Sequence, residues 1–331
     1  MKCLTFCIAA LSLISLSPAD AFTAVGDHGA LHVAGTHLAD VHGKATALSG
    51  VSFFWSNTHY GQERFYNADA VHTFASDWGV TVIRAAMGVD GTGGYKSDKI
   101  ANIRRVKTLV DAAIKDGIYV IIDWHSYQAD EDGSDLAIEF FKDMATTYGK
   151  APNIIYEIYN EPMKVSWAGR VKPYAEAVID AIRAVDRSNL IIVGSPEWDQ
   201  DVDTAAADPI VGRDNIVYAL HFYAGDHKQP IRDKATKALA LGAPLFVSEW
   251  GSVNSDGSGV VNAEEAEKWL AFIHANCLSE ASFAVSDKTE GTSIFKPGVS
   301  STGPWKDEEL TPSGLLVRNL LRQSRTNCKP A

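Results

Sequence analysis

The chain has 331 residues, of which 46% are hydrophobic and 21% are charged, a composition typical of a folded globular protein. Disordered, collagen-like and coiled-coil chains have other compositions and are excluded. Acidic residues outnumber basic ones by 41 to 30, and the formal net charge is −11 with no basic block. This charge balance argues against nucleic acid or an anionic membrane as a partner.

The N-terminal residues have the features of a secretory signal peptide. Lys2 gives a positive start, residues 4–16 are mostly apolar, and residues 19–21 read Ala-Asp-Ala, which matches an A-x-A cleavage site. The apolar run is too short to span a bilayer. We therefore predict that residues 1–21 are removed and that residues 22–331 form one secreted, monomeric domain without a membrane partner.

Cysteine use agrees with export. Cys3 and Cys7 lie in the predicted signal peptide, so Cys277 and Cys328 are the cysteines that remain in the mature chain. In an oxidising compartment these two are expected to form a disulfide, although two unrelated thiols are the alternative. No Cys-x-x-Cys spacing is present, so the sequence offers no thiolate zinc site.

The mature chain is expected to begin with a β-hairpin. Residues 30–38 and 44–48 flank a turn at residues 40–43, and this hairpin could close the floor of a barrel. Four histidines fall in this region and invite a metal interpretation: His28, His32, His37 and His42. Their spacings follow neither one strand face nor one helix face throughout, so we predict no metal site there.

Beyond residue 47, short apolar and β-branched runs alternate with stretches of helical period. The eight expected strands are residues 48–53, 80–84, 118–124, 154–159, 190–194, 216–223, 244–250 and 281–286. The clearest helices are residues 98–116, which end before Gly117, and residues 171–187 and 262–276, the last with Asn262 and Glu265 in a capping pattern. The first of these helices is expected to carry one apolar stripe, made of Ile100, Ile103, Val106, Leu109, Val110 and Ile114. Crossovers long enough for helices imply parallel pairing.

Eight such units predict an α/β protein with a (β/α)8 TIM barrel. An open doubly wound sheet is the alternative, but no Gly-x-Gly-x-x-Gly follows a strand. In a TIM barrel the catalytic side chains lie where strands end and loops begin. The expected strand ends carry these polar or aromatic residues: Arg84, Asp123, His125, Asn160, Glu161, His221, Tyr223, Glu249 and Trp250.

Two of these residues are glutamates on different strands, Glu161 after the fourth and Glu249 at the end of the seventh. A single strand-end acid is often only part of a salt bridge. A pair of acids at matching depth is what glycoside hydrolysis requires, because one carboxyl protonates the leaving oxygen while the other attacks or activates water.

Eight segments in order make the chain resemble a bacterial-type endo-β-1,4-glucanase of glycoside hydrolase family 5, over about residues 31–321. They are GVSFFW at 50–55, GVTVIRAAM at 79–87, VIIDWH at 120–125, NIIYEIYNEP at 153–162, WDQDV at 198–202, ALHFYA at 219–224, VSEWG at 247–251 and SDK at 286–288. The resemblance implies a catalytic barrel that retains anomeric configuration, acts on a β-1,4-linked polysaccharide, and needs no cofactor and no metal.

By position, the resemblance makes Glu161 the general acid/base and Glu249 the nucleophile. Arg84 then keeps the nucleophile ionised, and Tyr223 donates a hydrogen bond to it. The two carboxyl groups of a retaining enzyme are expected about 5–5.5 Å apart. The pKa of Glu161 must also lie above that of Glu249.

The resemblance also implies residues that hold the sugars. Asn160 would contact the sugar 2-hydroxyl, and His125 and His221 would line the cleaved subsite. The substrate-binding candidates are Trp198, Phe283, Lys288, Glu290, His59, Tyr60 and Tyr95, with Trp55, Trp167 and Trp305 as further aromatic candidates. Aromatic rings suit this task because they stack on the flat C–H faces of sugars.

Three features depart from the family pattern. Phe283 stands where the family usually has a tryptophan that floors the attacked-sugar subsite, and this loses the indole N–H donor. His59 stands where a tryptophan often precedes Tyr-Gly-Gln. The helix after the fifth strand is barely recognisable around residues 201–207.

Other functions remain open at this stage. A retaining mannanase, xylanase or mixed-linkage glucanase would use the same catalytic set. A metal hydrolase is suggested only by Asp123-x-His125, with Glu161, His221 or Glu249 as further ligands. A non-catalytic carbohydrate-binding barrel is suggested by Phe283 and His59.

Overall fold

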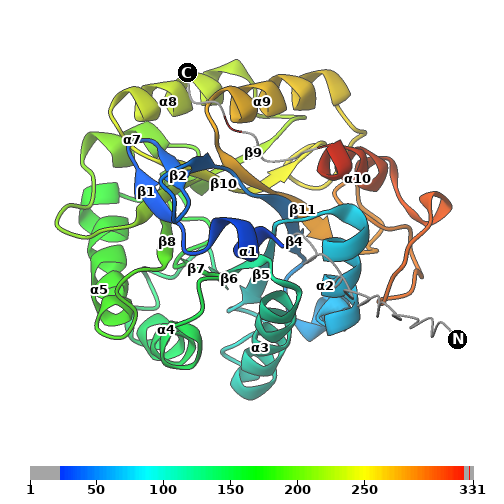
Figure 1. The fold of residues 1–331 in the computed structure, drawn as a ribbon, viewed down its shortest axis with the longest axis horizontal. Coiled ribbons are helices and arrows are strands. Elements are labelled where there is room, and N and C mark those ends of the chain that lie inside the picture. Colours follow the sequence, from blue (N-terminus) through cyan, green and yellow to red (C-terminus); the bar gives the residue numbers. More distant parts are fainter. Residues whose placement is uncertain (1–22, 324–327, 329–331) are drawn as a thin grey trace, which may run out of the picture.

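The computed structural model describes residues 23–323 and residue 328, so the predicted signal peptide lies outside the described residues. Its centre is a closed barrel of eight strands, and every neighbouring pair is parallel, as the sequence predicted (Figure 1). The strands are β4 (Ser49–Phe53), β5 (Val82–Gly88), β6 (Tyr119–His125), β7 (Ile154–Glu157), β8 (Leu190–Val193), β9 (Ile216–Tyr223), β10 (Leu245–Gly251) and β11 (Ser279–Val285).

Helices surround this barrel (Figure 1). They are α2 (Ala68–Thr73), α3 (Lys99–Asp116), α4 (Asp135–Tyr148), α5 (Lys172–Arg183), α6 (Pro196–Asp199), α7 (Val202–Ala207), α8 (Gln229–Ala240), α9 (Ala263–Ala275) and α10 (Pro312–Gln323). The weak pattern at residues 201–207 therefore does form a helix. This is the (β/α)8 TIM barrel, whose strands bury apolar side chains on both faces.

Helix α3 illustrates how local signals set an element. The Asp98 side chain accepts the N–H of Ala101 at the N-terminus, and Gly117 adopts a left-handed φ of 68° that ends the helix. The predicted apolar stripe is wider than the buried face, since Ile100 is 81% exposed and Ile114 lies at the edge, 36% exposed. Only the middle of the helix packs on the barrel.

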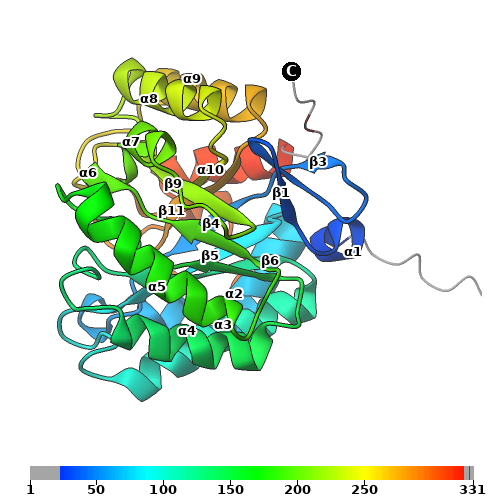
Figure 2. The same ribbon diagram turned by 90° about the vertical axis from the view of Figure 1, so that its left-hand side faces the viewer.

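The N-terminal region forms three antiparallel strands instead of one hairpin. They are β1 (His32–Ala34), β2 (His37–Ala39) and β3 (Ala45–Thr46), in the order β1-β2-β3. The prediction missed the tight turn at Gly35, whose φ of 64° suits glycine. Together with α1 (Ala24–His28), this sheet lies at one end of the barrel (Figure 2).

The sheet closes the barrel floor by apolar contact. Leu31 and Leu38 belong to the same buried cluster as Tyr119, Ile155 and Phe246 of the barrel strands. Cys277, which follows α9, forms a disulfide with Cys328, as expected. Within the described residues, no helix is long and apolar enough to cross a membrane.

Candidate active site

A cavity of about 630 Å³ opens where the barrel strands end. Its lining includes both predicted catalytic glutamates and several aromatic rings. The main lining residues are Phe54, Trp55, Tyr60, Tyr127, Glu161, Trp198, His221, Tyr223, Glu249, Phe283, Lys288 and Glu290. The carboxyl ends of the strands therefore bring together residues that are more than 200 positions apart in sequence, as TIM barrels do.

Arg84 of β5 organises the floor of this cavity. Its side chain is fully buried, and three of its nitrogens contact carboxylates: Nη1 to Glu249 Oε2 at 2.7 Å, Nε to Glu157 Oε2 at 2.6 Å, and Nη2 to Asp123 Oδ2 at 3.0 Å. Nη2 also donates to Asn160 Oδ1 at 2.6 Å. A buried guanidinium is stable only with such partners, so its position also fixes theirs.

Glu249 of β10 has the surroundings of an ionised carboxylate. Burial would raise its pKa, but the charge of Arg84, the charge of His221 and a hydrogen bond from Tyr223 outweigh burial, and its pKa lies below the ordinary value. The Tyr223 hydroxyl donates to Glu249 Oε1 at 2.5 Å. The carboxylate therefore has a donor on each oxygen and stays ready to act as a nucleophile.

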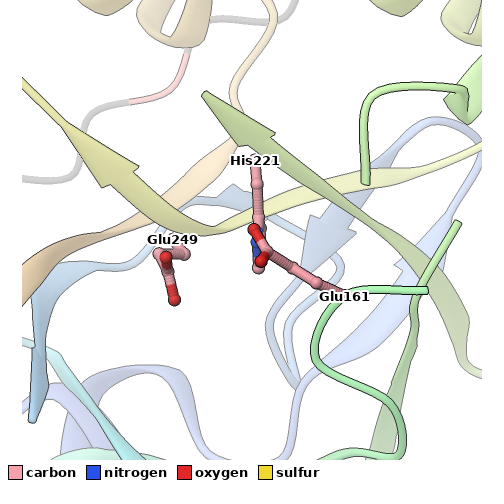
Figure 3. A group of neighbouring side chains, drawn as sticks. All are labelled: Glu161, His221 and Glu249. Carbon is pink, nitrogen blue, oxygen red and sulfur yellow. The ribbon is translucent and has the colours of Figure 1, made fainter. Parts of the chain in front are cut away.

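Glu161 follows β7 and has the opposite character. Burial raises its pKa above the ordinary value, and the negative Glu249 raises it further, while His221 works against both. One oxygen of each glutamate and one nitrogen of His221 lie within 4.8 Å of one another. Figure 3 shows the Glu161 carboxylate beside the His221 ring, with Glu249 across from it.

His221 of β9 links Glu161 to Ser248 and, through Ser248, to Glu157. Its Nδ1 lies 3.0 Å from Glu161 Oε1, and its Nε2 lies 2.9 Å from Ser248 Oγ. Ser248 in turn donates to Glu157 Oε1 at 2.5 Å. Burial lowers the pKa of His221, but the acidic groups around it, Asp199 first among them, raise the pKa well above its ordinary value.

His125 of β6 differs from His221 in charge. Its Nδ1 lies 2.7 Å from Asp123 Oδ2, yet burial and the nearby Arg84 lower its pKa to about 3, so the ring is neutral at physiological pH. The ring packs against Trp55, with centroids 4.7 Å apart. His125 is 3% exposed and is not among the residues that line the cavity, so the structure places it behind Trp55 and not in the lining, where it was predicted.

The same geometry bears on the metal-hydrolase alternative. Glu161, His221 and Glu249 approach closely enough to hold a metal ion. Both Glu249 oxygens and Nδ1 of His221 already have protein hydrogen-bond partners. Asp123 is likewise engaged by Arg84 and His125. These contacts fit acid–base chemistry better than ligation, because a metal ligand must turn a lone pair toward the ion.

Most predicted sugar-binding residues line the cavity, but two do not. Tyr95 is 2% exposed and packs on Trp124 with centroids 4.9 Å apart, so its prediction as a binding residue is wrong. The Tyr95 ring instead fills an apolar pocket between α3, α4 and the barrel. His59 is exposed, stacks on Tyr60 at 3.7 Å and contacts the Thr92 carbonyl outside the cavity lining.

The remaining binding candidates form two groups. Lys288 pairs with Glu290 at 2.7 Å and lies over the Phe54 ring at 4.3 Å. Trp198 lines the same cavity after β8, which is three strands around the barrel from β11, the strand that precedes Lys288. Lys164 Nζ lies 5.9 Å from the Trp198 ring centre. Of the looser candidates, Trp55 lines the cavity, whereas Trp167 and Trp305 are buried in the core and cannot bind a sugar.

Sequence reasoning missed several polar residues of the site. Glu157 and Ser248 lie inside strands, where a charged or hydroxyl residue in an apolar run was the available signal. Tyr127 lines the cavity from the loop after β6. Asp199 follows Trp198 in a loop rich in acids, and nothing in that pattern distinguishes it from a surface acid.

Comparison with known proteins identifies the family of this chain. A family model described as cellulase (glycosyl hydrolase family 5) matches residues 39–289. The chain belongs to glycosyl hydrolase family 5. Endoglucanase Z of Dickeya dadantii is 50% identical over 279 residues, 84% of this chain and 63% of that protein. An endoglucanase of Clostridium saccharobutylicum is 42% identical over 301 residues, 90% of this chain and 66% of that protein.

Solved structures of family 5 agree with this barrel. The catalytic domain of a Thermobifida fusca endoglucanase superposes with a TM-score of 0.85 at 32% identity, covering 92% of this chain and all of that one. A variant of that domain was solved in complex with cellotetraose. The chain spans less than two thirds of the length of the two curated relatives named above.

Proposed function

We propose that this family 5 protein is an endo-acting β-1,4-glucanase that works by retaining double displacement. The observation that carries the proposal is a pair of buried glutamates, Glu161 and Glu249, whose facing atoms lie within 4.8 Å and whose pKa values are shifted in opposite directions. Separate environments for an acid and a nucleophile are what this chemistry requires.

In the first step, Glu249 attacks the anomeric carbon while Glu161 donates its proton to the leaving oxygen, and a covalent glycosyl–enzyme forms. Arg84 and Tyr223 hold the attacking carboxylate in place with contacts of 2.7 and 2.5 Å. Asn160, fixed by Arg84, turns toward the sugar 2-hydroxyl. In the second step Glu161, now ionised, takes a proton from a water molecule while the oxygen of that water attacks the anomeric carbon. The bond between this carbon and Glu249 then breaks, and the carboxylate is regenerated.

The open cavity suits binding within a polymer, because sugars on both sides of the cleaved bond find partners. Lys288 and Glu290 offer a charged pair on one side, and Trp198 offers a half-buried ring on the other. Phe283 supplies an apolar face between them. Binding to a β-1,4-glucan chain rests on these groups and on the cellotetraose complex of the Thermobifida relative.

The signal-like residues 1–21 and the disulfide support export of the protein. We further propose that residues 22–331 act as one catalytic domain and as a monomer. A metal requirement is not part of the mechanism, because the acid, the base and the nucleophile are all side chains. Activity that survives dialysis against EDTA is therefore expected.

The test is hydrolysis of carboxymethyl cellulose, glucomannan and xylan, with viscosity and reducing ends followed together. A fast fall in viscosity on the cellulose derivative, lost in Glu249→Gln and kept in the exposed control Glu308→Gln, would support the proposal. Preference for another polymer would change the substrate class. Oligosaccharide binding without turnover by the folded protein would defeat the enzymatic function.

The two glutamates can be told apart by leaving group. Glu161→Gln should lose kcat/KM on cellulose-like substrates but retain much of it on aryl cellobiosides with good leaving groups, because kcat/KM reports the first step and that step then needs no acid. Glu249→Gln should lose activity on both. Equal loss across leaving groups for Glu161→Gln would refute its role as the acid.

A further inference from the structure

Asp199 is a third carboxyl beside the acid/base residue, and the proposed mechanism does not use it. It is fully buried, and its Oδ2 has no hydrogen-bond partner among the residues that the structure describes. That oxygen lies 3.4 Å from Nδ1 of His221, the same nitrogen that lies 3.0 Å from Glu161 Oε1. An unpartnered buried carboxylate oxygen is costly, so its position requires an explanation.

The backbone holds Asp199 in this place at a cost. Glu197, Trp198 and Asp199 have φ values of 58°, 55° and 61°, so three consecutive residues other than glycine adopt left-handed conformations. Such residues are uncommon and cluster where function demands them. The turn leaves Trp198 lining the cavity and Asp199 buried beneath it, with Oδ1 accepting the N–H of Ser195.

We propose that Asp199 is a positioning residue for the acid/base carboxyl: it shares the Nδ1–H of His221 with Glu161. When Glu161 carries its proton, the N–H turns to Asp199 Oδ2. When Glu161 is ionised, the N–H returns to Glu161 Oε1. The other ring nitrogen is occupied by Ser248, so Nδ1 is the one that can alternate. This inference rests on the function proposed above, because it assumes that Glu161 cycles between its two protonation states.

The charges around Asp199 support this arrangement. Burial, with the acidic Glu161 and Glu157, raises the pKa of Asp199 well above its ordinary value, although His221 lowers it. The protonation of Asp199, Glu161 and His221 is therefore linked, because each charge affects the others. Whenever Asp199 is ionised, its charge beside Glu161 disfavours a second negative charge, so Glu161 keeps its proton to a higher pH than it would without Asp199.

The experiment uses Asp199→Asn, which keeps an oxygen for the Ser195 N–H and replaces the second oxygen by an amide. Asp199→Ser is the second variant, and Asp208→Asn, an exposed acid of the following loop, is the matched control. The pH profile of kcat/KM is measured on a cello-oligosaccharide. The basic limb, which reports loss of the Glu161 proton, should move to lower pH by about one unit in both Asp199 variants and not in the control.

An aryl cellobioside with a good leaving group separates positioning from a general loss of structure. Its rate of glycosylation should change little in Asp199→Asn, because that step does not need the acid, whereas a damaged fold would reduce both substrates alike. An unchanged basic limb in both Asp199 variants, or the same shift in Asp208→Asn, would overturn the inference.

A direct readout keeps this test separate from the proposed function. The pKa of Glu161 can be followed by 13C NMR of labelled glutamate, assigned with Glu161→Gln, in wild type and in Asp199→Asn. A lower pKa of Glu161 in the variant supports the inference even without turnover, and an unchanged pKa refutes it. Inactivity of the wild type on every polymer would instead defeat the proposed function alone.

Discussion

Glu280 of β11 makes the stability of this protein depend on pH in a way that one substitution can remove. It lies outside the cavity, is 7% exposed, and accepts hydrogen bonds from the Ser49 hydroxyl and, at 2.5 Å, from Trp250 Nε1. Burial raises its pKa to about 7, and these two hydrogen bonds offset only part of that effect. No cation pairs with this carboxyl among its contacts in the described residues.

The sign of the effect follows from the two pKa values. In the unfolded chain Glu280 has its ordinary pKa of 4.5, below the folded value of about 7. Below the unfolded value the group is protonated in both states and costs nothing. As the pH rises toward and through 7, the folded protein progressively loses stability, because it must hold the proton or bury the charge. The full difference corresponds to about 3 kcal/mol.

Glu280→Gln removes this cost because an amide stays neutral and can still serve both partners. The free energy of unfolding of the variant relative to wild type should rise by about 3 kcal/mol between pH 4 and pH 8, with most of the change between about 4.5 and 7. Guanidinium unfolding at several pH values measures it. The control is Glu308→Gln, whose side chain is 73% exposed. A pH-independent difference for Glu280→Gln would refute the reasoning.

Two other predictions concern the cavity and the C-terminus. Phe283→Trp should raise kcat/KM on cello-oligosaccharides several-fold, because the larger ring adds stacking area and an N–H donor at the cavity wall. An unchanged or lower kcat/KM would show that the site is adapted to phenylalanine. Replacing both Cys277 and Cys328 by serine should lower the free energy of unfolding by about 4 kcal/mol, since the bond closes a loop of 51 residues, and thermal unfolding of the variant against wild type measures this.

Short-range sequence patterns are enough to predict much of the fold. Each barrel strand is a short apolar run, and α3 carries its own start at Asp98 and stop at Gly117, so periodicity and caps were enough to predict them. The turn at Gly35 was missed because a tight turn between two short strands interrupts no long pattern. The extent of the buried face of α3 was also overestimated, because exposure of Ile100 depends on how far the neighbouring elements reach.

The two glutamates were predictable because an acid at the end of an apolar strand conflicts with burial unless it is used. Tyr95 shows the limit of such reasoning, since an aromatic residue in a loop can equally fill the core, and only packing against Trp124 decides this. Asp199 has no sequence signal that separates it from an ordinary loop acid, and the signal at Glu157 is only that of a charge at an apolar strand. Their importance comes from distances to His221 and Arg84, which the closed barrel brings together from strands far apart in the chain. The sequence by itself thus determined the elements and the proposed reacting pair, whereas the tertiary structure decided which charges surround that pair, because pKa values depend on neighbours in space.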